Sequence, residues 1–289
     1  MTRRFRIVDI LYIIMMILPV CFGIAIKVMT TPPSEGINIT GARIFFEIPM
    51  PIQNLPVTES QVNSVIVIIF VLFLCLYLTH GIKSGVWLKR HHIAELIVEK
   101  STSMVVGNMG EYFKDFAPFI VAILGLSGFS SLITLLGLYA PTSDINIIAG
   151  WAILVFGLIT YYKMKCGPVE YVKSFANPLL MAPLNVIGEV ATPISMAFRH
   201  YGNVLSGSVI SVLIAAGLSG LSNLIFGSFT EFPFLQIGIP AILSIYFDIF
   251  SGVLQAYIFA MLTMLYISGG FPLELYMKRK KEKTQKCEN

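Results

Sequence analysis

The chain has 289 residues, of which 56% are hydrophobic and only 12% are charged. Soluble domains carry roughly 25% charged residues, so this composition excludes an ordinary soluble protein and indicates a membrane protein. The net charge of +4 is less informative than the positions of the basic residues along the chain.

Six stretches of the chain are long and apolar enough to cross a bilayer, which takes roughly 17–25 residues. The last two exceed the length of a perpendicular crossing, which predicts that they are tilted. We therefore expect an all-α polytopic membrane protein with about six spanning helices, ending in a long tilted helix hairpin. The stretches are 7–28, 64–82, 116–138, 147–163, 186–219 and 239–268.

The first stretch has two interpretations. An apolar run after Arg3, Arg4 and Arg6 fits a signal peptide as well as a membrane span. The run from Ile7 to Ile26 is long for a signal core, and no Ala-x-Ala-like site follows it, which favours a retained span. Cleavage would leave five spans and an external N-terminus.

The segments between the spans differ in character. Residues 30–63 are rich in proline, which predicts an irregular segment. Residues 86–115 mix charged and apolar residues at helical spacing, as expected for an interfacial amphipathic helix. Proline breaks at 166–168 and 176–183 separate the fourth span from the fifth.

Basic residues alternate between the two sides of the predicted spans. They gather before the first span and after the second, fourth and sixth, whereas the opposite loops carry few. Because basic residues mark the cytoplasmic side, both termini are expected in the cytoplasm if the first span is retained. The basic clusters are Arg3, Arg4 and Arg6; Lys83, Lys89 and Arg90; Lys163, Lys165 and Lys173; and Lys278, Arg279, Lys280, Lys281, Lys283 and Lys286.

No metal or cofactor site is indicated by the cysteines and histidines. The adjacent His91 and His92 would point about 100° apart on a helix, which is poor geometry for a shared metal ion. The four cysteines lack ligand spacing and also give no disulfide framework; they are Cys21, Cys75, Cys166 and Cys287.

The fifth span carries Arg199 near its middle, with no acidic residue on the same helix face. A charge within a membrane is expensive and functional by default. Helical spacing places Ser195, Asn203 and Ser206 beside it as a polar stripe. Glu189 precedes the arginine by ten residues, which corresponds to about 15 Å along a helix.

The sixth span carries Asp248 and Gln255, seven residues apart and hence on one face. If the last two spans form an antiparallel hairpin, Arg199 lies at the depth of Gln255, and Ser208 at the depth of Asp248. A single Asp or Ser inside a bundle is often only a structural group satisfied by a neighbour. That alternative stays open for each of these residues except the arginine.

Three motifs in order give the chain a family resemblance. PISMAFRHYGN at 193–203, APTSDINIIAGWAIL at 140–154 and LQAYIFAMLTMLYIS at 254–268 resemble the a subunit of bacterial F-type rotary ATP synthases. The resemblance runs from about residue 112 to residue 270. It implies an ion-channel domain at 64–289, preceded at 1–63 by an N-terminal membrane segment and an external irregular segment.

The resemblance implies a non-catalytic stator subunit of an H⁺- or Na⁺-transporting ATP synthase. Such a subunit offers two offset half-channels to a ring of small subunits, each with an ion-binding carboxylate. Implied partners are this ring, the b-type peripheral stalk, indirectly the catalytic head, and lipid, with no nucleic acid and no cofactor. The implied location is the bacterial cell membrane.

The same resemblance implies roles for single residues. Arg199 matches the essential arginine, which keeps the ring carboxylate ionised and blocks ion leak. Asn203 and Gln255 match its polar neighbours, and Glu189 matches an acid of the cytoplasmic exit. Asp144 and Asn146 match polar residues near the external side.

Several features depart from the family pattern. Ser208 stands where many members have Glu, and Asp248 stands where some have His, so we expect Asp248 to be the external ion relay. His200 replaces a common leucine; it either titrates near neutral pH or simply reaches a polar neighbour, which is the interpretation we favour. The first span is additional to the usual five.

Two other classes of function fit the sequence less well. A stand-alone secondary transporter would use Arg199 to bind an anionic substrate, but no internal repeat supports this class. An intramembrane enzyme would need a motif such as HExxH or a pair of aspartates, which this sequence lacks.

Overall fold

The computed structural model describes residues 2–30, 41–51, 54–82, 88–166, 168, 171, 182–226, 242 and 245–271, with the side chains of residues 2–6, 166, 223, 226, 245 and 248 outside the described part. The helices are α1 Thr2–Thr30, α2 Glu59–Thr79, α3 Lys89–Met109, α4 Ala117–Leu132, α5 Ile145–Cys166, α7 Ala182–Phe226 and α9 Gly252–Gly269. Shorter elements are the strands β1 Ile44–Ile48 and β2 Leu55–Thr58, the 3₁₀ turns η2 Glu111–Phe116, η3 Ile133–Leu136 and η4 Pro141–Ser143, and the π-helix η6 Ile245–Ser251.

The predicted fold class is confirmed. Six helical segments of the described chain are long and apolar enough to cross a membrane, and each overlaps one of the six predicted stretches. Many large apolar side chains point outward from them, as expected for surfaces that contact lipid. The segments are Ile7–Thr30, Glu59–Thr79, Glu111–Leu136, Ile145–Lys165, Ala182–Ser222 and Ile249–Gly269.

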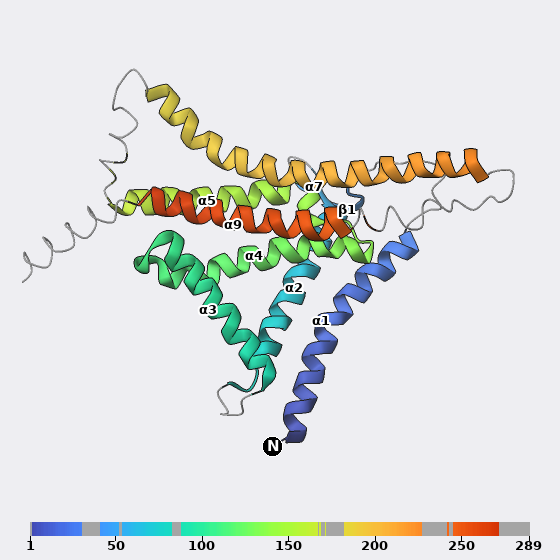
Figure 1. Ribbon diagram of the computed structural model, residues 1–289, viewed down its shortest axis with the longest axis horizontal. Coiled ribbons are helices and arrows are strands. Elements are labelled where there is room, and N and C mark those ends of the chain that lie inside the picture. The colour runs from blue at the N-terminus through green and yellow to red at the C-terminus, as the bar shows by residue number, and fades with distance from the viewer. Residues whose placement is uncertain are drawn as a thin grey trace, which may run out of the picture.

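The spanning helices do not share one direction. Figure 1 shows α4, α5, α7 and α9 running side by side, whereas α1, α2 and α3 descend from this layer at a steep angle. Helix α7 has 45 residues, which corresponds to about 68 Å, more than twice the roughly 30 Å hydrocarbon core. Helix α7 therefore has to be strongly tilted to remain within the membrane, as its length in the sequence predicts.

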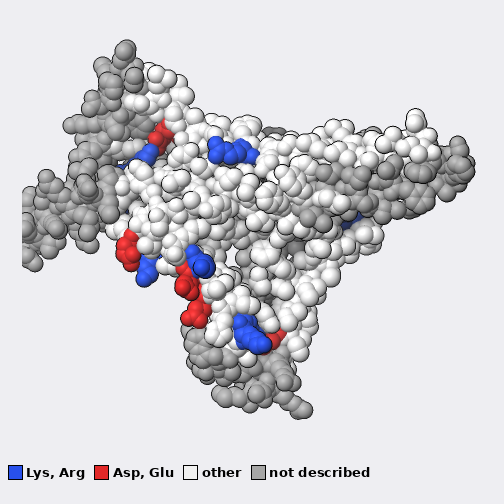
Figure 2. Space-filling view, viewed as in Figure 1, with Lys and Arg blue, Asp and Glu red and all other residues white. Residues whose placement is uncertain are grey.

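One hydrophobic core joins the layer of α4, α5, α7 and α9 to α3, which covers the segment predicted to be interfacial. Val105 and Met109 of α3 and Phe113 of η2 pack with Phe259 and Met264 of α9 in a single buried cluster. The rest of α3 is largely exposed, and Figure 2 shows acidic and basic groups gathered around this part of the molecule. The amphipathic pattern at 86–115 thus reflects one face that packs on the bundle and another that carries charge.

The prediction of an irregular segment at 30–63 is wrong for its second half. Strands β1 and β2 form an antiparallel pair in which Phe46 lies opposite Val57 and Ile48 opposite Leu55. Pro56 is tolerated because each strand of a two-stranded sheet has an unpaired edge, where a missing N–H costs nothing. The prolines therefore delimit this hairpin rather than prevent it.

Helix α1 is fixed to the bundle at both ends. Near its N-terminus, Asp9 Oδ1 lies 2.9 Å from His80 Nδ1 and 2.8 Å from Arg90 Nη1. Near its C-terminus, Lys27 Nζ donates to the carbonyl oxygen of Gly137. Between these contacts α1 packs along α2. Helix α1 is therefore packed into the structure by contacts along its length.

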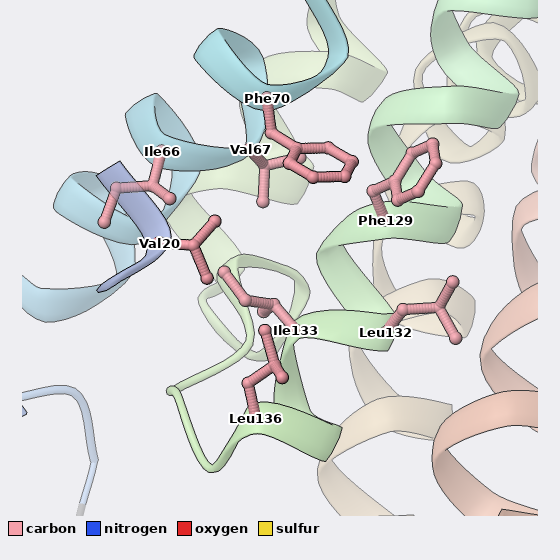
Figure 3. A pocket seen from close by; sticks show the side chains of 8 residues that line it. All are labelled: Val20, Ile66, Val67, Phe70, Phe129, Leu132, Ile133 and Leu136. Carbon is pink, nitrogen blue, oxygen red and sulfur yellow. The ribbon is translucent and has the colours of Figure 1, made fainter. Parts of the chain in front are cut away.

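An apolar pocket marks the place where α1, α2 and α4 meet (Figure 3). Val20 of α1 faces Ile66 and Val67 of α2, and Phe129 and Ile133 close the other side. Close by, Gly23 is buried against α2: a Cβ atom at this position would lie 2.8 Å from Ile66 Cδ1. A larger side chain here would have to push the end of the Ile66 side chain aside, which glycine avoids.

We expect Gly23→Val to destabilise the attachment of α1. The added side chain overlaps Ile66, and overpacking of this kind costs typically 1–3 kcal/mol, which should lower the apparent Tm of the purified chain in detergent by several degrees. Ala25→Val, at an exposed position of the same helix, is the matched control and should leave Tm unchanged. Equal Tm values for both variants would contradict the docking of α1.

Candidate functional site

Helix α7 has two faces of opposite character. Met196, Ala197 and His200 are buried in the bundle, whereas Ser195 and Arg199 are exposed. The alternation follows from helical periodicity, since residues three and four apart share a face. The polar stripe predicted from the sequence therefore lies on the side of α7 that faces away from the chain's own core, with Ser206 also exposed and Asn203 half-buried.

Arg199 has no counter-ion in the described part of the chain. Its guanidinium forms no ion pair and no hydrogen bond with any described residue. Figure 2 shows that the surface along α7 is mostly uncharged. A permanently charged group is thus displayed on an apolar helix, where it is available to a partner molecule.

His200 points the other way from Arg199 and is fully buried. Its Nε2 lies 3.4 Å from Ser127 Oγ of α4, and its ring packs edge-on against Trp151 of α5 and Phe259 of α9. These contacts agree with the interpretation that His200 reaches a polar neighbour. They also join α7 to three other helices, which fixes its rotation and hence the direction in which Arg199 points.

The hairpin predicted between the last two spans is present. Asn203 Nδ2 donates to Gln255 Oε1 at 3.2 Å, and Phe247 packs over Gly207, where a Cβ atom would lie 3.2 Å from its ring. The pairing is antiparallel, and the Gly207–Phe247 contact fits the expected register, whereas Gln255 pairs with Asn203 rather than with Arg199. The hydrogen bond of Gln255 goes to Asn203, one turn beyond Arg199, so the glutamine is bound next to the arginine without contacting it.

A small polar cavity lies where α4, α7 and η6 meet. The hydroxyl-bearing residues Ser131, Thr134, Ser208 and Ser251 line it. The Ser208 hydroxyl also donates to the carbonyl oxygen of Leu205 at 2.8 Å. The backbone of Asp248 runs through the adjoining π-helix, although its side chain is outside the described part. π-Helical turns are frequent at functional sites because they redirect side chains.

A second polar group lies where α2 meets η4. Ser60 Oγ donates to Asp144 Oδ2, and the backbone N–H of Asn146 donates to Asp144 Oδ1 at 3.0 Å. Asn63 Nδ2 donates to the carbonyl oxygen of Tyr139 at 2.8 Å. Burial, together with the negative charge of nearby Asp144, raises the pKa of the Tyr139 phenol above its ordinary value.

The sequence did not single out two polar residues of α2 that bind this loop, Ser60 at Asp144 and Asn63 at the Tyr139 backbone. Ser60 and Asn63 are three residues apart at the start of an apolar stretch, and both are buried. Polar residues at helical spacing on an apolar helix were the signal that could have singled them out. Nothing local indicated that they meet a loop 84 and 76 positions further along the chain.

At the opposite end of α7, Glu189 forms an ion pair. Lys163 Nζ of α5 lies 2.6 Å from Glu189 Oε1 and 2.8 Å from Oε2, and Tyr171 Oη donates to Oε1 at 3.4 Å. Burial and the adjacent carboxylate raise the pKa of Tyr171. The sequence indicated Lys163 only as one basic residue among several on the cytoplasmic side.

Comparison with known proteins decides the family. The sequence profile described as ATP synthase A chain matches residues 62–268, which include every site residue discussed above except Ser60. The chain belongs to this family. The profile begins within α2, so α1 and the β-hairpin precede the part that it matches.

Named relatives from bacteria support this assignment. ATP synthase subunit a of Nitratidesulfovibrio vulgaris is 33% identical over 187 residues, covering 62% of this chain and 72% of the relative. The subunit a of Trichlorobacter lovleyi is 29% identical over 228 residues, covering 74% and 90% respectively. A sodium ion specific subunit a from Propionigenium modestum is 35% identical over 156 residues, covering 52% and 48%.

Membership in the ATP synthase a subunit family defines the protein in broad terms. It is a multi-pass membrane protein and the ion-translocating stator part of the Fo sector. Members of this family are non-catalytic subunits of the ATPase complex, in which they work together with other ATP synthase subunits.

We expect His200→Ala to destabilise the bundle without a change at the exposed face of α7. Removing a fully buried ring leaves a cavity between Trp151, Phe259 and Ser127, and large-to-small core substitutions cost about 2–5 kcal/mol. The Tm of the purified chain in detergent should fall clearly. Phe198→Ala, at a side chain that is 58% exposed, should have a much smaller effect. A reversed order would show that His200 does not anchor α7.

Proposed function

We propose that this subunit conducts H⁺ or Na⁺ to and from a rotating ring through two offset half-channels that Arg199 keeps separate. One observation carries the proposal: the arginine is exposed on α7 and has no counter-ion among the described residues. An isolated cation within a membrane is strongly unfavourable. The ring carboxylates would supply the missing negative charge one after another as the ring turns.

Electrostatics explains why arginine suits this position. Its guanidinium stays protonated throughout the working pH range, so it attracts each arriving carboxylate in its ionised form. An opposite charge nearby lowers the pKa of a carboxyl group, which favours release of the bound ion. The same charge repels a free cation, so ions cannot pass directly from one half-channel to the other.

The polar groups between η4 and η6 support an external path. Asp144, held by Ser60 and by the backbone of Asn146, would collect ions at its mouth. The cavity beside Ser208 would lead them to Asp248, the carboxylate nearest in sequence to the Asn203–Gln255 bond. Asn203 and Gln255 would position the end of this path next to Arg199.

The region around Glu189 supports an internal path. Glu189 and Thr192 line a small cavity with Lys163 and Tyr266. It lies about 15 Å along α7 from Arg199, on the side that the basic residues identify as cytoplasmic. The two paths are therefore offset along α7, as rotation between them requires.

Each ion that crosses would turn the ring by one subunit. A charge moved through the membrane potential provides about 2.3 kcal/mol per 100 mV, and this energy would reach the catalytic head through the ring. Peripheral stalk subunits of the b type would hold the chain still against the ring. We assign it to the bacterial cell membrane, with both termini in the cytoplasm.

The central test is Arg199→Ala in membranes that contain the whole complex. Loss of the charge should abolish ATP-driven ion pumping, because the ring carboxylate no longer has a fixed cation at the stator. Hydrolysis by the catalytic head should persist, and measuring both activities in the same vesicles provides the control. Pumping at the wild-type rate in this variant would refute the proposal.

A second test concerns the external carboxylate. We expect Asp248→Asn to slow ion uptake from the external side by at least about ten-fold, as loss of a proton-transfer group does. Placing a carboxylate across the hairpin, with Ser208→Glu in the same chain, should restore part of the rate. Full activity of the single variant would exclude Asp248 as the relay.

A further inference from the structure

Glu189, the acid that the internal path would need, is held in an ion pair by Lys163. Both carboxylate oxygens are contacted, at 2.6 and 2.8 Å from Lys163 Nζ. The two side chains are largely shielded, with 22% and 20% of their surfaces exposed. An ion pair with both oxygens engaged and little solvent is more firmly held than an ordinary surface pair.

The groups that face this ion pair from neighbouring elements are few. Tyr171 donates to Glu189 and lies under the lysine, with Nζ 5.8 Å from its ring centroid. Tyr266 of α9 lines the same cavity. Within the described helices, α9 carries no acidic or basic residue, and α7 carries Glu189, Arg199 and the buried His200. Among the described residues, Lys163 is therefore the only charged group in contact with this carboxylate.

The packing around the lysine stem is specific. Gly270, just after α9, lies so close that a Cβ atom there would be 2.7 Å from Lys163 Cε and 3.1 Å from its Cγ. A side chain at position 270 would displace the lysine from the cavity. The small residue at the end of α9 therefore leaves room for the aliphatic part of the Lys163 side chain, whose ammonium reaches from α5 to Glu189 on α7.

From this geometry we infer that Lys163 gates the internal path by closing Glu189 with its own ammonium. The inference rests on the proposed function, in which Glu189 passes ions between the cytoplasm and the ring. An ion that arrives at Glu189 has to displace the ammonium from both oxygens, and the ammonium returns when the ion leaves. Because the ammonium neutralises Glu189 between transfers, the cavity does not accumulate cations from the cytoplasm.

The gate has a direction-dependent consequence. When ATP hydrolysis drives pumping, ions enter from the cytoplasmic side and compete with Lys163 for Glu189. Removing the ammonium leaves an unpaired carboxylate, which binds a cation at lower activity. Pumping in the variant should therefore persist at lower cytoplasmic cation activity, which for H⁺ means at higher cytoplasmic pH.

The experiment uses inverted membrane vesicles that contain the whole complex, so the cytoplasmic face is in contact with the medium. ATP-driven pumping is measured against medium pH at fixed Na⁺, and against Na⁺ at fixed pH. For Lys163→Met, which keeps the aliphatic stem next to Gly270, we expect half-maximal pumping at roughly ten-fold lower activity of the transported cation. If the cation is H⁺, the alkaline limb moves up by about one pH unit.

Two control variants separate the charge of Lys163 from its bulk and from the overall charge of the helix end. Lys163→Arg retains the charge and should keep the wild-type cation dependence. Lys165→Met removes a charge from the same helix, at an exposed side chain whose Nζ lies 5.8 Å from the Tyr162 ring centroid rather than at Glu189. It should also leave the dependence unchanged.

The outcomes distinguish the gate from the proposed function. If Glu189→Gln changes the cation dependence but Lys163→Met does not, the gate is refuted and the internal path stands. If Glu189→Gln pumps with the wild-type dependence, the internal path itself is refuted. If Lys163→Met shifts the dependence and this shift disappears in the double variant with Glu189→Gln, the lysine acts through the carboxylate.

Discussion

The structure depends on the rotational setting of α7, because one face of this helix has to be buried so that the other can present Arg199. His200 and Met196 fix the buried face against α4, α5 and α9. The arginine then points away from the bundle, where no described residue neutralises it. A charge held in this way is costly in lipid alone, and the proposed function answers that cost with an acid on a partner.

Asp144 and Glu189, the carboxylates of the proposed external and internal paths, have different partners. On the side of η4, Asp144 is held by the neutral donors of Ser60 and the Asn146 backbone, which leave its charge in place. Near the start of α7, Glu189 is neutralised by Lys163. A neutral donor orients an acid, whereas an ammonium also competes with any arriving cation. The two carboxylates therefore differ in how easily a cation could reach them, a difference that the helical architecture alone does not create.

Helix α1 lies outside the part of the chain that the family profile matches, yet it is integrated into the fold. Asp9 reaches α2 and α3 at one end, Lys27 reaches the loop after η3 at the other, and Gly23 allows close packing between them. Polar contacts at both ends, together with close packing between them, define the position of the helix along its partner. The additional span thereby braces the α2–α3 corner.

The sequence by itself determined the elements. The six spans, the faces of α7, the antiparallel hairpin and the unpaired arginine all follow from apolar length and helical period, which are local properties. The β-hairpin at 44–58 lies outside what the local signals predict, because its prolines stand at the boundaries and edges of the strands rather than breaking them. Only the tertiary structure decided which polar groups meet: His200 with Ser127, Asp144 with Ser60, and Glu189 with Lys163, pairs separated by 73, 84 and 26 positions. Such pairs depend on how helices far apart in the chain cross one another, and no periodicity within a single helix encodes that.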